Sequence, residues 1–238
     1  MSNKAVLILS GGMDSTTLLY KIIKDGFDPH VLSINYGQKH SKEIKFARKT
    51  CKKLKINHKV IDLRLVGKQL LQGSALTSKN IDVPEGHFED NSMKATVVPS
   101  RNLLLLSLAI SYAVSIKASN VFYGAILGDL VIYPDCRPEF VDAVKNVAKL
   151  CDWQPVEIIA PFLTMDKGDV VKLGIELGVN YKWTSTCYNG KELACGVCGS
   201  CQERVAAFVK AGIVDPIKYK NGWDKTVEHV LAVAKEKK

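Results

Sequence analysis

The feature that most constrains the fold is a glycine turn between a strand pattern and a helix pattern. An apolar run at residues 5–9 leads into Ser10-Gly11-Gly12-Met13-Asp14-Ser15, and helical periodicity follows. Two glycines let the backbone turn sharply with its N–H groups pointing inward, and Ser15 or Thr16 is placed to cap the next helix. Inward N–H groups and the positive end of a helix dipole bind anions. The turn therefore predicts a polyphosphate site at a strand-to-helix junction.

This loop differs from a Walker A loop, because Met13 and Asp14 follow Gly12 where the lysine motif is required. It resembles the SGGxDS loop of the PP-loop ATP pyrophosphatase superfamily, whose members cleave ATP between the α and β phosphates. The resemblance implies that residues 9–19 bind ATP, and these are Leu9, Ser10, Gly11, Gly12, Met13, Asp14, Ser15, Thr16, Thr17, Leu18 and Leu19. In the alternative interpretation, the glycines only allow a tight strand-to-helix turn and bind no phosphate. The flanking strand and helix and the internal Asp-Ser favour the ATP site.

Strand and helix patterns alternate along most of the chain. Strand patterns fall at residues 4–9, 30–34, 58–63, 120–125 and 156–159, and helix patterns at 14–24, 41–54, 101–117, 138–150 and 166–177. This order predicts an α/β fold with a Rossmann-like, doubly wound parallel sheet and helices on both faces. Ligands of such sheets bind at the carboxyl edge of the strands, where loops 10–15, 35–40, 128–137 and 161–167 would meet.

The expected domain organisation is a nucleotide-binding α/β domain over residues 1–178, followed by a helical metal-binding extension over 179–238 that packs on it. The stretch from about 64 to 99 is polar and is punctuated by Gly73, Pro84 and Gly86. Loops of that length are usually functional or disordered, so we expect a long active-site flap that opens onto Arg101.

Four cysteines form a dense C-x7-C-x2-C-x2-C pattern at Cys187, Cys195, Cys198 and Cys201. Four thiolates at this density favour a closed tetrahedral zinc site, one per chain, whose role is structural because the shell has no open position. An iron–sulfur cluster is the main alternative, although the usual fourth spacing and following proline are absent. Unlinked thiols are the third interpretation.

Several other cysteines and histidines carry no motif. Cys51 and Cys151 are expected as small core residues, and Cys136 has no assigned role. The histidines without metal-ligand spacing are His30, His58, His87 and His229.

The chain of 238 residues is basic, with 33 Lys and Arg against 24 Asp and Glu, a formal charge of +9. The lysines are scattered, and the densest group, residues 39–59, lies on a predicted amphipathic helix, which favours a solvated face over a nucleic-acid surface. The longest apolar run, 103–116, is too short for a membrane span and contains serines. No signal peptide is visible, so we expect a cytoplasmic protein in which seven cysteines indicate metal or catalysis before disulfides.

Four further segments and the cysteine cluster join the phosphate loop in one family pattern, and the chain resembles the QueC family nearly end to end. The segments are Tyr36-Gly37-Gln38-Lys39-His40, Val98-Pro99-Ser100-Arg101-Asn102, Tyr133-Pro134-Asp135-Cys136-Arg137-Pro138-Glu139-Phe140, Thr186-Cys187-Tyr188 and Cys195-Gly196-Val197-Cys198-Gly199-Ser200-Cys201. Ser100 and Gly199 depart from the family's usual glycine and aspartate. Neither departure removes one of the four cysteines.

The resemblance implies an ATP-dependent C–N ligase that converts 7-carboxy-7-deazaguanine and ammonia to 7-cyano-7-deazaguanine, in biosynthesis of queuosine- or archaeosine-type 7-deazapurines. It uses ATP, with magnesium, twice, through an adenylate and an amide. Asp14, Arg101 and Lys167 are the expected catalytic residues, and the cations, with Arg137, would neutralise charge on the phosphates. Small molecules are the expected partners, without nucleic acid or membrane; a homodimer stays open.

A 7-deazaguanine has a donor-rich edge that a carboxylate reads and a flat ring on which an aromatic stacks. Tyr133, Asp135 and Arg137 are therefore the expected substrate-binding residues. Asp129 could bind substrate or magnesium or cap a turn, and His40 could move a proton, contact phosphate or be a helix-start polar residue. The rival functions are a tRNA-thiolating PP-loop enzyme and a non-catalytic nucleotide- or RNA-binding protein.

Overall fold

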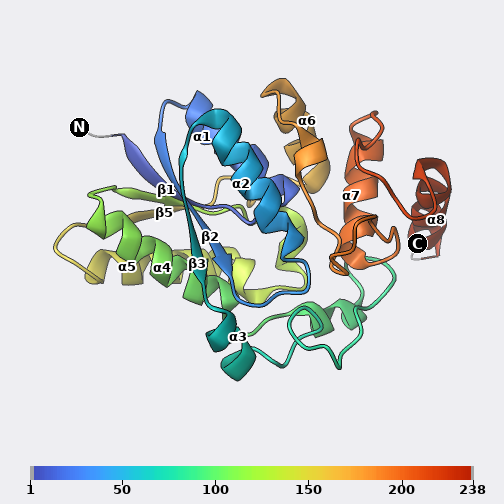
Figure 1. The fold of residues 1–238 in the computed structure, drawn as a ribbon, viewed down its shortest axis with the longest axis horizontal. Helices are drawn as coiled ribbons and strands as arrows, with labels where there is room; N and C mark the ends of the chain where they lie inside the picture. Colours follow the sequence, from blue (N-terminus) through green and yellow to red (C-terminus); the bar gives the residue numbers. More distant parts are fainter. Residues whose placement is uncertain (1–2, 237–238) are drawn as a thin grey trace.

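A five-stranded parallel sheet forms the centre of the structure, a computed structural model that describes residues 3–236 (Figure 1). Its strands are β1 (Lys4–Ile8), β2 (Asp28–Asn35), β3 (Asn57–Asp62), β4 (Asn120–Phe122) and β5 (Glu157–Ile159). Their order is β3-β2-β1-β4-β5, so the direction of winding reverses between β1 and β4. The expected doubly wound parallel sheet is confirmed, and its ligand crevice belongs at the carboxyl ends of β1 and β4.

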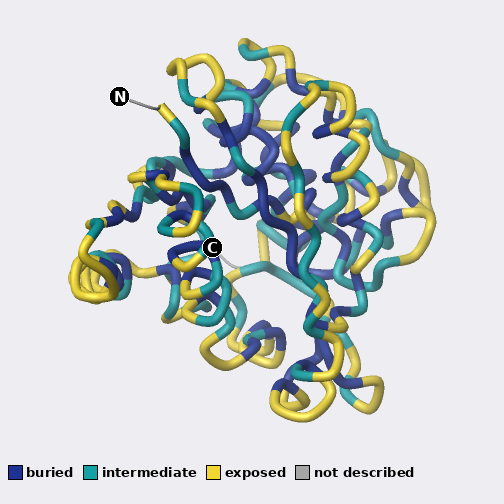
Figure 2. Tube along the Cα trace, turned by 60° about the vertical axis from the view of Figure 1, so that its left-hand side comes forward, coloured by how far each residue is buried: buried dark blue, intermediate teal, exposed yellow. Residues whose placement is uncertain are grey.

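Helices cover both faces of the sheet. One face carries α1 (Met13–Lys24), α2 (Lys42–Leu54) and α6 (Lys167–Glu176), and the other carries α4 (Arg101–Ser115) and α5 (Pro138–Leu150). Successive residues of β1 point to opposite faces. Ala5 and Leu7 pack with α1 and α2, whereas Val6 packs with α4 and α5. Figure 2 shows buried backbone in the interior of the molecule and exposed segments around it.

Two local expectations at the crevice need correction. Helix α1 begins at Met13 with Gly12 as its N-cap, so Ser15 and Thr16 lie inside the first turn and do not cap it. Strand β4 ends at Phe122, not at residue 125, because the chain leaves the sheet at Gly124 to pass beside the first turn of α1. A side chain at Gly124 would meet the backbone nitrogen of Ser15 at 3.3 Å.

The stretch 64–99 is more ordered than the expected loop. It contains the short helix α3 (Arg64–Leu70) and the 3-10 turn η1 (Asn91–Thr96), and residues 74–78 are buried. Gly67 packs directly on the carbonyl oxygen of Tyr36, where any Cβ would lie at 1.7 Å. This helix rests on a tertiary contact, which periodicity does not reveal. The role of the stretch as a flap stays a prediction.

The C-terminal part packs against the α/β body. It contains η4 (Tyr181–Trp183), α7 (Gly199–Lys210) and α8 (Trp223–Lys235). Within the α/β body, two 3-10 turns, η2 (Leu127–Leu130) and η3 (Pro134–Cys136), lie between β4 and α5. Met13 of α1, Val171 of α6 and Phe208 of α7 share one buried cluster. The predicted domain boundary after residue 178 stays a prediction. Residues 1–2 and 237–238, at the outer ends of the two predicted domains, lie outside the described residues.

No helix within residues 3–236 has both the length and the apolar character needed to cross a membrane.

Candidate active site

The phosphate loop is held in shape by contacts that only glycine permits. Gly11 has φ +94°, and a Cβ there would lie 2.0 Å from the carbonyl oxygen of Glu43 in α2. The Gly12 N–H donates to Ser10 Oγ at 3.0 Å, and Ser10 Oγ lies 3.0 Å from Ser15 Oγ. The loop also receives a hydrogen bond from the C-terminal part, because the Ser185 N–H donates to the Gly11 carbonyl.

A cleft of about 210 Å³ opens above this loop at the carboxyl edge of the sheet, as expected. Sequence-predicted residues that line it are Leu9, Ser10, Gly12, Asp14, Ser15, Arg101 and Lys167. Those absent from its lining, among the residues described, are Gly11, Met13, Thr16, Thr17, Leu18, Leu19, Tyr133, Asp135 and Arg137. Thr17 instead bonds Tyr181 at 2.9 Å, and Leu18 and Leu19 belong to the core. Only part of the 9–19 stretch therefore faces the cleft.

Three carboxylates surround the Lys167 ammonium group at one end of the cleft. Asp14 Oδ2 lies 3.5 Å from Lys167 Nζ, Glu203 of α7 forms an ion pair with it, and Asp129 is close enough to interact. Burial alone would lower the pKa of Lys167, but Asp14 and Glu203 hold it above its usual value. Burial raises the pKa of Glu203 to about 7. Lys167 therefore stays a cation beside the phosphate loop.

Asp14 and Asp129 differ in how their carboxylate oxygens are satisfied. Asp14 Oδ1 is buried and has no hydrogen-bond partner within residues 3–236. Asp129 Oδ2 accepts the Ile126 N–H at 3.2 Å, so the turn-capping alternative for Asp129 is realised, while it also faces the cleft. Carboxylate oxygens are the ligands that magnesium prefers, and the orphan oxygen of Asp14 fits such an ion.

Glu203 was missed by sequence reasoning. It lies two residues after Cys201, on a helix that the sequence tied only to the metal. No local pattern links it to Lys167, and only the packing of α7 on α6 brings the two together.

The predicted substrate residues lie around the edge of the cleft. Asp135 Oδ2 accepts the Asn102 N–H at 2.9 Å and so anchors the first turn of α4. Tyr133 OH bonds Tyr188 OH at 2.8 Å, and the Arg101 guanidinium lies 6.0 Å from the Tyr133 ring centre. Arg137 is exposed and donates to the Leu130 carbonyl at 3.0 Å. Their roles toward substrate stay predictions.

A second ionisable pair lies in the cleft at the end of β2. His40 and Glu43 are both buried, and His40 Nε2 is 3.5 Å from Glu43 Oε1. Burial raises the pKa of Glu43 to about 8, and burial with the Arg101 charge lowers the pKa of His40 to about 3. Sequence reasoning left His40 open and missed Glu43. Glu43 lies in the first turn of α2. The hydrophobic periodicity of that helix does not show that its first turn abuts the phosphate loop.

The four cysteines form one compact cluster. Their Sγ atoms all lie within 4.8 Å of one another, and Cys195 Sγ is 3.8 Å from Cys201 Sγ. A tetrahedral ion with bonds of about 2.3 Å spaces its sulfur ligands by about 3.8 Å. A cluster with a separate iron behind each thiolate needs wider spacing. The donor set and its size therefore fit a single metal ion.

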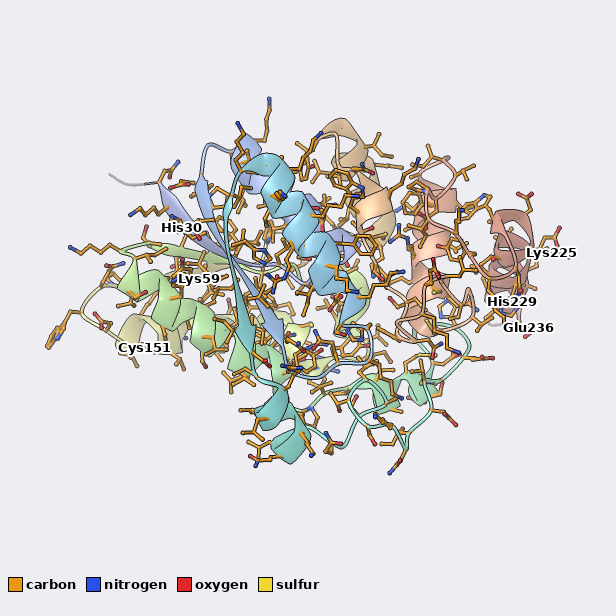
Figure 3. All side chains as sticks on the ribbon, viewed as in Figure 1. His30, Lys59, Cys151, Lys225, His229 and Glu236 are labelled. Atoms are coloured by element: carbon orange, nitrogen blue, oxygen red, sulfur yellow. The ribbon has the colours of Figure 1, made fainter. Side chains whose placement is uncertain are left out.

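Among the residues that the structure describes, the remaining cysteines and histidines form no second candidate metal centre. Cys51 is buried as expected, but the expectation for Cys151 was wrong: it is exposed, because it follows the last turn of α5 beyond the packed face. His30 and His229 lie at opposite ends of the molecule (Figure 3).

Sequence comparisons relate the chain to one family of known proteins. The family model described as "Queuosine biosynthesis protein QueC" matches residues 4–212. A 7-cyano-7-deazaguanine synthase of Marinomonas sp. is 53% identical over 92% of this chain and 99% of its own length. The synthase of Caldicellulosiruptor saccharolyticus is 53% identical over 93% of this chain and 99% of its own length.

A solved structure supports the fold alone. NMN synthetase from Francisella tularensis superposes with a TM-score of 0.50 at 15% identity, covering 99% of this chain and 85% of that one.

Proposed function

Because the chain belongs to the QueC family, we propose that it is a 7-cyano-7-deazaguanine synthase that converts 7-carboxy-7-deazaguanine and ammonia to the nitrile at the expense of two ATP molecules. The observation that carries the proposal is the cleft itself. It joins an anion-binding glycine loop, a buried lysine cation and an orphan carboxylate oxygen at one sheet edge. These are the parts that transfer of an adenylyl group requires.

In the first step, a carboxylate oxygen of the substrate attacks the α phosphate of ATP, and pyrophosphate leaves. The backbone N–H groups of loop 10–15 would hold the phosphates at the start of α1. Lys167 and Arg101 would neutralise the charge that develops on them, and Asp14 would hold the magnesium that accompanies ATP. Ammonia then displaces AMP, which leaves with one substrate oxygen, and a proton is released.

In the second step, the same groups would act on the amide. Its oxygen attacks a second ATP, pyrophosphate leaves again, and loss of AMP with two protons from nitrogen gives the nitrile. Both activations transfer an adenylyl group to an oxygen at the same carbon, so one phosphate loop serves both. The substrate ring need only stay in place while AMP and ATP exchange.

The cysteine cluster would hold one structural zinc per chain. Four protein thiolates complete a tetrahedral shell and leave no position for substrate. The ion would supply folding energy to the 185–201 loop, which contacts the phosphate loop through Ser185.

Substrate and partner assignments complete the proposal. Tyr133 would contact the substrate ring at the edge of the cleft. Arg137 would contribute to substrate binding next to that ring. Asp135, engaged with Asn102, would support the site by fixing the start of α4 next to Arg101. We propose action on small molecules in the cytoplasm, without nucleic acid or membrane, with a homodimer as an open assembly.

Incubation of the purified protein with ATP, magnesium, ammonium and 7-carboxy-7-deazaguanine tests the function. Mass spectrometry should detect the amide and then the nitrile, with AMP as the nucleotide product. Turnover of a tRNA instead, or AMP release that does not depend on the deazaguanine, would refute the proposal.

A further inference from the structure

Glu43 and His40 form a buried polar pair that the reaction steps above do not use. Both line the cleft, and their side chains are each 9% exposed. Glu43 comes from the first turn of α2, and its backbone carbonyl touches Gly11. The pair therefore lies beside the phosphate loop, on the β2 side of the cleft, and it is separate from the set of Asp14, Asp129 and Glu203 around Lys167.

Within residues 3–236, no lysine or arginine forms an ion pair with Glu43. The charged or titratable groups that face it are His40 from the same turn, Tyr36 at the end of β2 and Arg101 from α4, and the Gln38 amide also interacts with it. A buried carboxyl group without a strong partner is costly unless donors reach it. His40 adds a second unmet group, because its Nδ1 has no hydrogen-bond partner within residues 3–236.

An aromatic wall stands next to the pair. The Tyr188 ring lies 6.0 Å from the His40 ring, and its hydroxyl is fixed by the bond to Tyr133. Tyr123 adds a buried hydroxyl without a partner among the described residues, and it lines the same cleft. A flat ligand with hydrogen-bonding groups on its edge would satisfy these atoms together.

The chemistry of a carboxylate distinguishes between the two rings that the enzyme binds. A guanine-like ring presents its ring N1–H and its exocyclic amino group side by side, which are two donors for two carboxylate oxygens. Adenine presents one amino group beside a bare ring nitrogen, whose lone pair repels a carboxylate. Glu43 therefore suits the 7-deazaguanine and not the adenine of ATP.

We propose that Glu43 is a specificity-determining residue that accepts hydrogen bonds from the N1–H and amino group of the 7-deazaguanine ring, with His40 Nδ1 meeting the adjoining edge and Tyr188 bordering the ring. This assignment rests on the proposed function, since it names the subsite for that substrate. It places the base between α2 and Tyr188, beside the phosphate loop.

The test compares two ligands in matched variants. The ligands are 7-carboxy-7-deazaguanine and its analogue without the exocyclic amino group. Glu43→Gln is compared with Glu139→Gln, because both residues are second in their helices but Glu139 is exposed on α5. Asp135→Asn is the third variant, because its carboxylate was the sequence's candidate for the same edge. KM is measured for each deazapurine and for ATP, and thermal unfolding reports the fold.

The wild type and Glu139→Gln should bind the amino-free analogue about tenfold to a hundredfold more weakly than the substrate. Glu43→Gln should lose a similar factor for the substrate and discriminate less than threefold between the ligands, with its KM for ATP unchanged. Retained discrimination in Glu43→Gln, an equal rise in KM for ATP, or loss of discrimination in Asp135→Asn alone would overturn the assignment. So would a loss confined to kcat, which would indicate proton transfer instead.

Glu43→Asp covers the case in which Glu43→Gln does not fold. It keeps the charge but withdraws it by one methylene, so it should discriminate against the analogue less than the wild type does; unchanged discrimination would count against Glu43. The proposed function is judged separately, because it fails only if the wild type makes no nitrile from 7-carboxy-7-deazaguanine.

Discussion

Ser185 donates its backbone N–H to the carbonyl oxygen of Gly11 at 3.1 Å, joining the C-terminal part of the chain to the centre of the phosphate loop. Ser185 lies two residues before Cys187, the first residue of the cysteine cluster. The segment that a bound metal would order is therefore the segment that donates a hydrogen bond to the phosphate loop. The segment that leads into the cysteine cluster and the phosphate loop are joined by a hydrogen bond, although their residues are far apart in sequence.

Replacing Cys198 with Ala should cost solubility and folding before it costs chemistry, because a structural ion supplies folding energy. Cys151→Ala is the matched control, since Cys151 is exposed and lies outside the cluster. Elemental analysis of the colourless wild type should find about one zinc per chain. A folded, soluble Cys198→Ala that lacks only turnover would indicate a catalytic metal, and iron with a visible absorption band would indicate a cluster.

Gly11→Ala should be far more damaging than Gly178→Ala. Both glycines have positive φ, which costs an alanine about 1–2 kcal/mol, but only Gly11 also faces a backbone oxygen at 2.0 Å. A Cβ at Gly178 meets nothing within 4 Å. We expect Gly178→Ala to lose only the backbone term in chemical unfolding, and Gly11→Ala to lose more and to bind ATP poorly. Equal losses would show that the contact with Glu43 is not tight.

Asp14→Ala and Ser15→Ala should each abolish ATP-dependent turnover while the fold stays intact. Asp14 offers the orphan oxygen beside Lys167, and Ser15 lies where the loop meets the start of α1. Asp142→Ala is a suitable control, because Asp142 is exposed on α5. Pyrophosphate release and thermal unfolding are measured together. If both variants still adenylate substrate, the nucleotide binds elsewhere.

Binding of 7-carboxy-7-deazaguanine should strengthen as the pH rises from 6 to 8. Burial in the cleft raises the pKa of Glu43 to about 8, so below that pH the carboxyl group must lose a proton before it accepts two N–H donors. His40 stays neutral throughout this range, because its pKa is lowered to about 3. The affinity, measured by calorimetry without ammonium, should rise by up to about tenfold per pH unit.

Glu43→Gln is the control for that titration, because it keeps Glu203, whose pKa is raised to about 7. Its affinity should be flat over the same range. A pH dependence that survives in Glu43→Gln would assign the titration to another group.

The features of this protein that could be predicted from its sequence are those that local sequence patterns determine. The loop at Ser10–Ser15 and the four cysteines are short, continuous motifs, and their geometry follows from glycine conformations and thiolate spacing. The parallel sheet followed from alternating periodicities. These features depend on neighbours in the chain, so the sequence displays them directly.

The parts that sequence could not predict depend on long-range packing. Glu203 reaches Lys167 only because α7 packs on α6, and Glu43 reaches the cleft only because α2 abuts Gly11. Packing also gives Asp135 a contact that the sequence does not show, because its carboxylate accepts the Asn102 N–H at the start of α4, while its role toward substrate stays a prediction. Helix α3 likewise depends on the contact of Gly67 with Tyr36.

The most direct test of the account follows the substrate's oxygen atoms. With 7-carboxy-7-deazaguanine labelled with oxygen-18 in both carboxylate positions, each adenylation should transfer one labelled oxygen to AMP. We predict two molecules of singly labelled AMP for each nitrile, and unlabelled pyrophosphate. Label in inorganic phosphate, release of ADP, or one AMP for each nitrile would contradict two adenylations at this phosphate loop.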